Sequence, residues 1–237
     1  MHSKTNLSKM LSYKLKSKIK KEVNDKKIAR KLTPYYLPLA KRIIFSDNYL
    51  PAFNKNNLKL ITSKIDQLTK QGIQSANKHY SVDAIIEATG FKSTEFLSPI
   101  CIKGKKGIDI SQEWSKGAHA YLGMMVPDFP NLFLLYGPNT NLGHSSIVYM
   151  IECQINYILK CMATVERKQL NSISIKRQAN DNYNQKIQAS MQDRVWSSNI
   201  QSWYKTEEGK IVNNWPYSSI AYWWNTRSPR FSNFNLQ

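Results

Sequence analysis

Two short apolar runs that each stop at a glycine turn constrain the fold of this chain more than any other feature. Residues 83–88 run into Thr89 and Gly90, and residues 131–136 run into a turn at residues 137–139. Apolar runs of this length that end at turn residues are typical of buried strands in an α/β sheet. Ligands of open parallel sheets bind beyond the carboxyl ends of the strands. The sequence therefore predicts two strands whose turns lie close together beside a ligand site.

A long amphipathic helix is predicted directly after the second turn. Ser145 or Ser146 is a candidate N-cap for it. Apolar residues recur at helical spacing on one face, namely Val148, Ile151, Ile155, Ile158 and Met162. The free N–H groups and the positive dipole end of such a helix favour an anion or an electron-rich ring edge at the preceding turn. An ordinary strand, turn and helix with small residues for close packing would give the same pattern.

The two turns resemble those of the Baeyer–Villiger and flavin-containing monooxygenases, which oxygenate organic substrates with FAD, NADPH and O2. In that family an Ala-Thr-Gly turn leads back into the FAD domain, and a stretch with Gly-Pro-Asn and Gly-His-Ser-Ser lies against the flavin ring. The resemblance implies nine cofactor-binding residues, Thr89, Gly90, Gly137, Pro138, Asn139, Leu142, Gly143, His144 and Ile147. His144 could hydrogen-bond the cofactor or cap local backbone.

The resemblance extends in order over residues 32–234, but one part of the family pattern is missing. Lys41 and Arg42 stand in a Lys-Arg segment of the family, and Trp114 stands in a Trp-centred one. The aromatic residues of the tail also match, namely Trp196, Trp203, Tyr204, Trp215 and Tyr222. The chain contains no Gly-x-Gly-x-x-Gly turn of the kind that binds the pyrophosphate of FAD or NADP. We therefore assign no catalytic residue to this chain.

The implied fold class is α/β, a partial two-dinucleotide-binding-domain flavoprotein fold without the N-terminal FAD Rossmann half and with a C-terminal aromatic-rich extension. Residues 1–86 are expected to be a remnant of the NADP-binding domain, and residues 87–237 the returning part of the FAD-binding domain with its tail. The implied function is that of the C-terminal portion of a flavoprotein monooxygenase, inactive as this chain alone. It would perform Baeyer–Villiger or heteroatom oxidation of a small organic substrate with NADPH, FAD and O2, and a separately encoded N-terminal half is a candidate partner.

Positive charge is concentrated at the N-terminus. Residues 1–31 carry eleven Lys and Arg against two acids, which is half of the net charge of +18. A helix over residues 7–23 would carry an apolar stripe flanked by lysines, built from Leu7, Leu11, Leu15, Ile19 and Val23. Such a helix is either a solvated helix of the NADP domain or a peripheral contact with an anionic membrane. No zinc site or RNA-recognition motif accompanies the charge, so no nucleic-acid partner is predicted. The alternative to an enzyme portion is thus a non-catalytic remnant that acts as a basic membrane-surface or interaction module.

The cysteines and the absence of targeting signals indicate a cytoplasmic protein, with a peripheral position at the inner membrane surface left open. Cys153 and Cys161 would lie about 12 Å apart along the predicted helix, too far to bridge. With Cys101 they are expected to be free thiols, and no Cys or His spacing predicts a metal site. No signal-peptide core and no run near the ~20 apolar residues of a membrane span is present.

Overall fold

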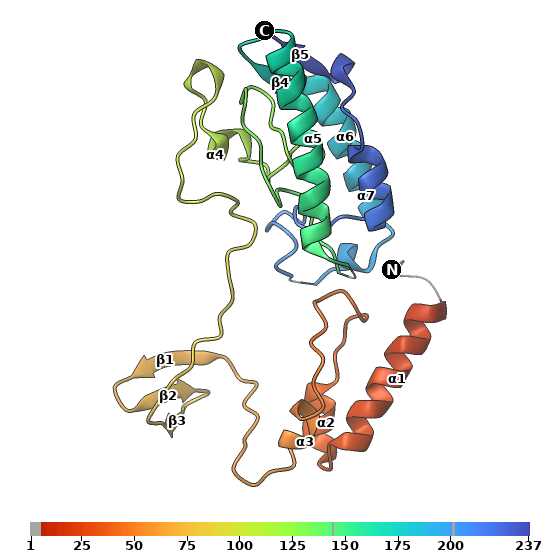
Figure 1. The fold of residues 1–237 in the computed structure, drawn as a ribbon. Coiled ribbons are helices and arrows are strands. Elements are labelled where there is room, and N and C mark those ends of the chain that lie inside the picture. The colour runs from red at the N-terminus through yellow and green to blue at the C-terminus, as the bar shows by residue number, and fades with distance from the viewer. Residues whose placement is uncertain (1–5, 144, 201) are drawn as a thin grey trace. The chain divides into compact units, whose positions relative to one another are not determined.

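A computed structural model describes residues 6–143, 145–200 and 202–237, and the chain divides into two compact units (Figure 1). The helical unit comprises Leu39–Arg42 and Lys92–Gln237. The N-terminal unit comprises the described part of Thr5–Pro38 together with Ile43–Phe91. The assignment of residues 1–86 to an NADP domain and of the remainder to an FAD domain stays a prediction.

The N-terminal unit combines three helices with a small antiparallel sheet. Its elements are α1 (Asn6–Glu22), α2 (Lys26–Leu32), α3 (Tyr49–Ala52), β1 (Ile65–Thr69), β2 (Gly72–Ser75) and β3 (Lys78–Ser81). The strands pair in the order β1-β2-β3. Helix α1 confirms the helix predicted over residues 7–23. At its C-terminal end Ile19 and Val23 are buried against Ala29 of α2, whereas Leu7 and Leu15 of the same stripe are exposed.

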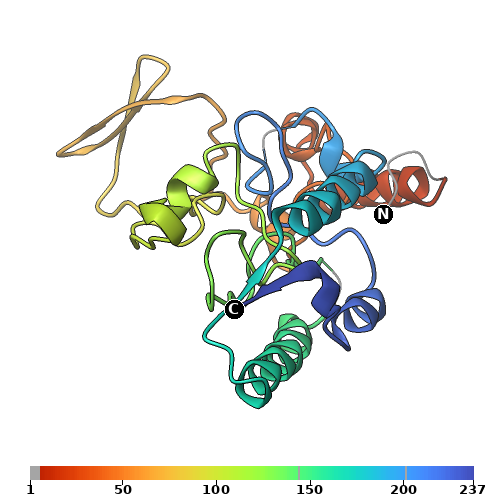
Figure 2. The ribbon, with the colours of Figure 1, turned by 90° about the horizontal axis from the view of Figure 1, so that it is seen from above.

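The helical unit is built around three long or medium helices and a two-stranded sheet. Its elements are α4 (Ile110–Glu113), α5 (Ile147–Arg167), β4 (Ile173–Ile175), α6 (Arg177–Met191), α7 (Ser219–Thr226) and β5 (Phe234–Leu236), with short 3-10 turns at Lys105–Gly107, Val195–Ser197 and Phe231–Asn233. Helices α5 and α7 pack side by side, and β4 pairs antiparallel with β5 near the C-terminal end of α5 (Figures 1 and 2). Tyr157 and Cys161 of α5 join Ile173, Ile175 and Phe234 in one core cluster.

Helix α5 confirms the helix predicted after the second turn, but it buries a different face. Ser146 is its N-cap and accepts a hydrogen bond from the Tyr149 N–H at 3.4 Å. The buried face carries Met150, Cys153, Gln154, Tyr157, Cys161 and Thr164. Of the predicted apolar face, Val148, Ile155 and Met162 are exposed. The sequence pattern missed the buried face because that face includes polar side chains, which can be buried when they are hydrogen-bonded.

The two predicted strands are not formed, and this part of the prediction is wrong. Residues 83–88 form no strand, and Ile86 is 92% exposed. A strand needs a neighbouring strand for its backbone hydrogen bonds, and no described segment pairs with residues 83–88. Residues 131–136 also form no strand, and Asn131 and Tyr136 at the two ends of the run have positive φ angles, 58° and 56°, which a strand does not adopt. The fold is mixed α/β, and the sheets within the described residues are antiparallel.

The thiols are free, as expected from their spacing. Cys101 is exposed, and Cys153 and Cys161 are buried in α5. No cluster of potential metal ligands occurs in the described part of the chain. Within that same part, every helix is too short or too polar to cross a membrane.

Candidate functional site

The segment between residues 137 and 147 leads into α5 and contains six described residues of the predicted cofactor site. Four of them are buried, namely Gly137, Pro138, Asn139 and Leu142. Gly143 is exposed and Ile147 is half-buried. His144 lies outside the described residues. The segment thus passes from a buried turn to an open edge at the N-terminus of α5.

The buried turn is held by a distant segment near the C-terminus. The Asn139 N–H donates to the Val212 carbonyl at 2.7 Å, and its side-chain Nδ2 donates to the carbonyls of Ile211 at 2.9 Å and Asn214 at 3.0 Å. Asn141 adds a bond from Nδ2 to Asn214 Oδ1 at 2.8 Å. Asn139 adopts φ 57°, a conformation that Asn tolerates better than most residues. We call these contacts the Asn139 clamp; they fix the turn that precedes α5.

Gly137 and Gly143 have different surroundings. A Cβ on Gly137 would lie 2.3 Å from the Gly123 carbonyl oxygen, so close packing within the chain requires glycine there. A Cβ on Gly143 would meet nothing within 4 Å. Close packing therefore explains why position 137 is glycine, whereas a side chain at position 143 would point into open space.

A chain of buried and half-buried hydrogen bonds links the turn to α5 and α7. The Tyr136 N–H donates to Gln154 Oε1 at 3.0 Å, and the Tyr136 hydroxyl donates to Asn141 Oδ1 at 2.8 Å. Gln154 Nε2 donates to the Tyr222 hydroxyl at 2.9 Å, which donates in turn to the Leu122 carbonyl at 2.6 Å. Burial raises the pKa of Tyr222 well above its usual range, so this hydroxyl stays a donor. The network fixes the direction in which the N-terminus of α5 points.

Arg42 acts on the same region, although the sequence analysis assigned it no role beyond its place in a family segment. Burial raises the pKa of Tyr136 and of Tyr204, and the positive charge of Arg42 partly offsets both shifts. Its guanidinium therefore acts on the phenol that is hydrogen-bonded to the turn. No spacing rule separates Arg42 from the other basic residues, so local pattern could not have identified it.

The remaining predicted residues, Thr89 and Gly90, lie in the N-terminal unit. Both are exposed, and Gly90 has φ 86° with open space where a Cβ would be. Because the two glycine turns belong to different units, their proximity stays a prediction.

The open edge fits the electron-rich edge of a planar ring or an anion. The Ser146 side chain accepts a hydrogen bond from the Tyr149 N–H. The N–H groups of Ile147 and Val148 in the first turn have no acceptor within the helix. Those donors and the positive end of the α5 dipole lie four and five residues after Gly143, where the space beside the backbone is open. A flavin ring presents carbonyl and nitrogen acceptors, so these residues match the group that the sequence resemblance implies.

Known proteins with similar sequences are monooxygenases. A FAD-binding monooxygenase of Aspergillus niger, ktnD, is 38% identical over 211 residues, which are 87% of this chain and 35% of that protein. A Baeyer-Villiger monooxygenase of Pseudomonas aeruginosa is 40% identical over 201 residues, which are 84% of this chain and 38% of that protein. The chain thus spans little more than a third of these relatives. No protein-family model matches it.

Two solved structures share the fold of this chain. The structure of OTEMO with FAD and NADP matches all of this chain with a TM-score of 0.90 and 24% identity, over 46% of the OTEMO chain. The structure of cyclohexanone monooxygenase from Rhodococcus sp. Phi1 bound to NADP+ matches with a TM-score of 0.88 and 22% identity. At this identity the likeness shows that the fold is shared with part of these larger chains.

Proposed function

The chain belongs to the Baeyer–Villiger and FAD-binding monooxygenase family, and we propose that it forms the flavin-ring side of the cofactor site in such an enzyme. It is a portion of a flavin monooxygenase that matches less than half of its relatives' length. The intact enzyme would use NADPH, FAD and O2 to oxygenate a small organic substrate by Baeyer–Villiger or heteroatom oxidation. When bound, FAD supplies the oxygenating chemistry.

The chain's own residues would position the flavin ring. The first-turn N–H groups of α5 would donate to an acceptor at the ring edge, and the helix dipole would favour the negative charge that a reduced flavin carries. Gly143 would let the ring approach the backbone, and Thr89 and Gly90 stay proposed as further cofactor-binding residues. The Asn139 clamp would hold these donors in place by fixing the turn that precedes α5. The open edge at Gly143, close in sequence to helix N–H groups that have no acceptor within α5, is the single observation that carries this proposal.

The FAD pyrophosphate would be held by a Gly-x-Gly-x-x-Gly turn that this sequence does not contain. A separately encoded N-terminal half is the candidate source of that turn. Residues 1–86 would then complete the NADP side, and residues 87–237 the returning part of the FAD side.

Reconstitution tests this assignment. The chain is purified alone and after co-expression with the part of the Pseudomonas aeruginosa relative that it does not match. Alone it should be colourless and should not oxidise NADPH with added FAD; the co-expressed pair should retain flavin. Stoichiometric flavin on the chain alone would contradict the division of the cofactor site.

A variant at the open edge makes the test specific to Gly143. Gly143→Leu should fill the open space and lower flavin retention by the pair at least about tenfold, because a ring cannot then reach the helix donors. Asn156→Leu adds the same side chain at an exposed position of α5 and should leave retention unchanged. Equal retention in both variants would place the flavin elsewhere.

A further inference from the structure

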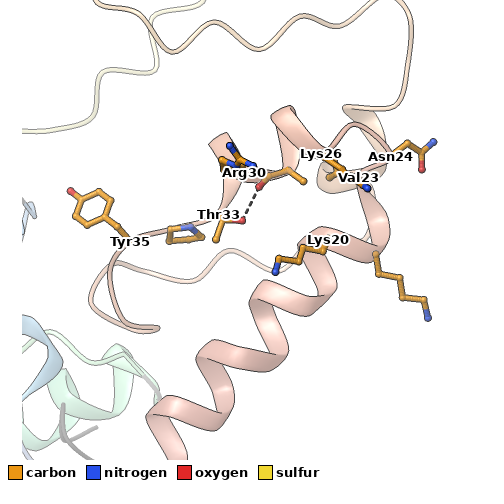
Figure 3. Close-up of a pocket in the computed structure, with 10 residues that line it drawn as sticks. Lys20, Val23, Asn24, Lys26, Arg30, Thr33 and Tyr35 are labelled. Carbon is orange, nitrogen blue, oxygen red and sulfur yellow. Dashed lines mark hydrogen bonds between the residues drawn. The ribbon is translucent and has the colours of Figure 1, made fainter.

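Cationic side chains gather around a cleft in the N-terminal unit. The cleft lies between α1 and the segment containing α2 and has a volume of about 810 Å³. Its lining includes Lys20, Lys21, Lys26 and Arg30, and it includes no carboxylate. Figure 3 shows Lys20 on α1, with Arg30 and Thr33 on the α2 side of the opening. We call Lys20, Lys21, Lys26 and Arg30 the cleft cations.

The nearby carboxylates are engaged elsewhere. Glu22 pairs with Lys18 at 3.6 Å. Asp25 caps α2 and accepts from the N–H groups of Lys27 at 2.6 Å and Ile28 at 3.1 Å. Across the described residues, none of the cleft cations lies within ion-pair distance of a carboxylate. Their positive charge is therefore not neutralised within the described structure.

The frame that carries the cleft cations is held by packing and by hydrogen bonds. Ile19 and Val23 of α1 and its following turn pack on Ala29 of α2. Asn54 closes the α1–α2 turn: its Nδ2 donates to the Glu22 carbonyl at 2.8 Å, and its Oδ1 accepts from the Asn24 N–H at 2.9 Å. The frame thus holds four like charges around one opening, where a bound anion would relieve their mutual repulsion.

We propose that this cleft binds a ligand that carries two or more phosphate groups. Arg30 can hold one phosphate in a bidentate manner, and the three lysines supply point charges for the others. The phenol of Tyr35, which lines the same opening and is 83% exposed, is available as a further donor. A volume of about 810 Å³ exceeds the space that one inorganic phosphate fills, and this favours a larger polyanion.

The phosphate groups could belong to a free molecule or to a lipid headgroup. Leu7 and Met10 of α1 are exposed by more than half, so α1 also offers apolar side chains to a lipid surface. The residues that line the cleft include none of the proposed flavin-site residues, so variants in the cleft test its ligand binding separately from flavin binding.

Binding of two probes to the full chain tests the site and distinguishes the two sources. Sodium pyrophosphate is titrated by calorimetry as the free probe. Phosphatidylcholine vesicles with and without phosphatidylinositol bisphosphate are used in a sedimentation assay as the lipid probe. Binding of pyrophosphate identifies a free ligand, and binding only to the bisphosphate vesicles identifies a headgroup. No binding of either probe would overturn the proposal.

A pair of charge-matched variants separates the cleft from diffuse electrostatic attraction. Lys20→Gln with Arg30→Gln removes one cation from each side of the cleft and should weaken binding about tenfold or more. Lys14→Gln with Lys31→Gln removes the same charge from exposed positions that do not line the cleft, and should weaken binding less than about threefold. Equal losses in the two double variants would show that net charge alone attracts the probe. All four positions are exposed, and circular dichroism should report unchanged helix content.

Discussion

The segments at residues 83–91 and 131–142 have the same sequence pattern but differ in how far they are buried. Each is an apolar run followed by a glycine turn. The second run ends in a buried turn that is hydrogen-bonded to residues 211–214. The first is exposed along its whole length, up to Phe91 at 96%. A local pattern thus marks where a run ends, whereas distant hydrogen-bond partners decide whether its turn becomes buried.

Removal of the Asn139 side chain should break this contrast most strongly. Asn139→Ala deletes both side-chain hydrogen bonds of Asn139, so the Asn214 carbonyl loses this donor while the Ile211 carbonyl keeps the one from Gln188 Nε2 at 2.9 Å. It also places Ala at φ 57°. We expect the free energy of unfolding to fall by about 3 to 4 kcal/mol, measured by urea denaturation.

Asn77→Ala is the matched control for backbone strain. Asn77 has φ 60° but is exposed in the β2–β3 turn. Its loss should cost about 1 to 2 kcal/mol, which is the cost of the left-handed conformation alone. Equal effects at the two positions would show that the clamp hydrogen bonds add nothing.

Gln154→Leu should have the second-largest effect, because it cuts the network between the turn and α7. It leaves the Tyr136 N–H without its acceptor and the buried Tyr222 hydroxyl without its donor. We expect a loss of about 2 kcal/mol in the free energy of unfolding. Gln178→Leu, at an exposed position of α6, should change stability by less than about 0.5 kcal/mol. A near-neutral Gln154→Leu would mean that the added apolar contact offsets the lost network.

The helices could be predicted from the sequence because their signals are local. Ser146 followed by helical apolar spacing predicts α5, and the apolar stripe with lysines predicts α1. The buried face of α5 could not be read in this way, because Gln154 is buried through its bond to Tyr222, 68 residues away. The pattern of apolar residues carries no information about such a partner.

The strands and most of the site depend on contacts that no short window contains. The Asn139 clamp joins residues more than 70 positions apart. Arg42 acts on Tyr136 from almost a hundred positions away in the chain. The positive φ angles at Asn131 and Tyr136 have no signal in a run that otherwise looks like a strand. The family resemblance implied Gly143 and Ile147 as cofactor-binding residues, whereas only the structure shows that the space beside Gly143 is open.

The free energy of unfolding should depend on pH through His119, which lies in the helical unit. Burial lowers the pKa of His119, and nearby Lys210 lowers it further, which outweighs the opposing charges of Glu113 and Asp181. The folded state therefore favours the neutral ring, so its stability is complete above the ordinary pKa of 6.5 and falls as the pH drops below it. Urea denaturation between about pH 7.5 and pH 5.5 should show this loss. His119→Gln should flatten the profile, while His79→Gln on exposed β3 should preserve it.

The smallest effect is expected on the exposed side, at Ile86. Its side chain is 92% exposed and sits in a segment without strand pairing, so Ile86→Lys removes no packing from the described structure. The free energy of unfolding should change by less than about 0.5 kcal/mol. The apolar run should nevertheless matter once a partner covers it, because lysine would then bring an unpaired charge into an apolar contact. In the co-expressed pair proposed above, Ile86→Lys should therefore lower co-purification of the two chains, whereas Lys64→Gln, also exposed in the N-terminal unit, should not. A large loss of stability in the chain alone would show that residues 83–88 are already packed in solution, and the contrast between the two segments would then disappear.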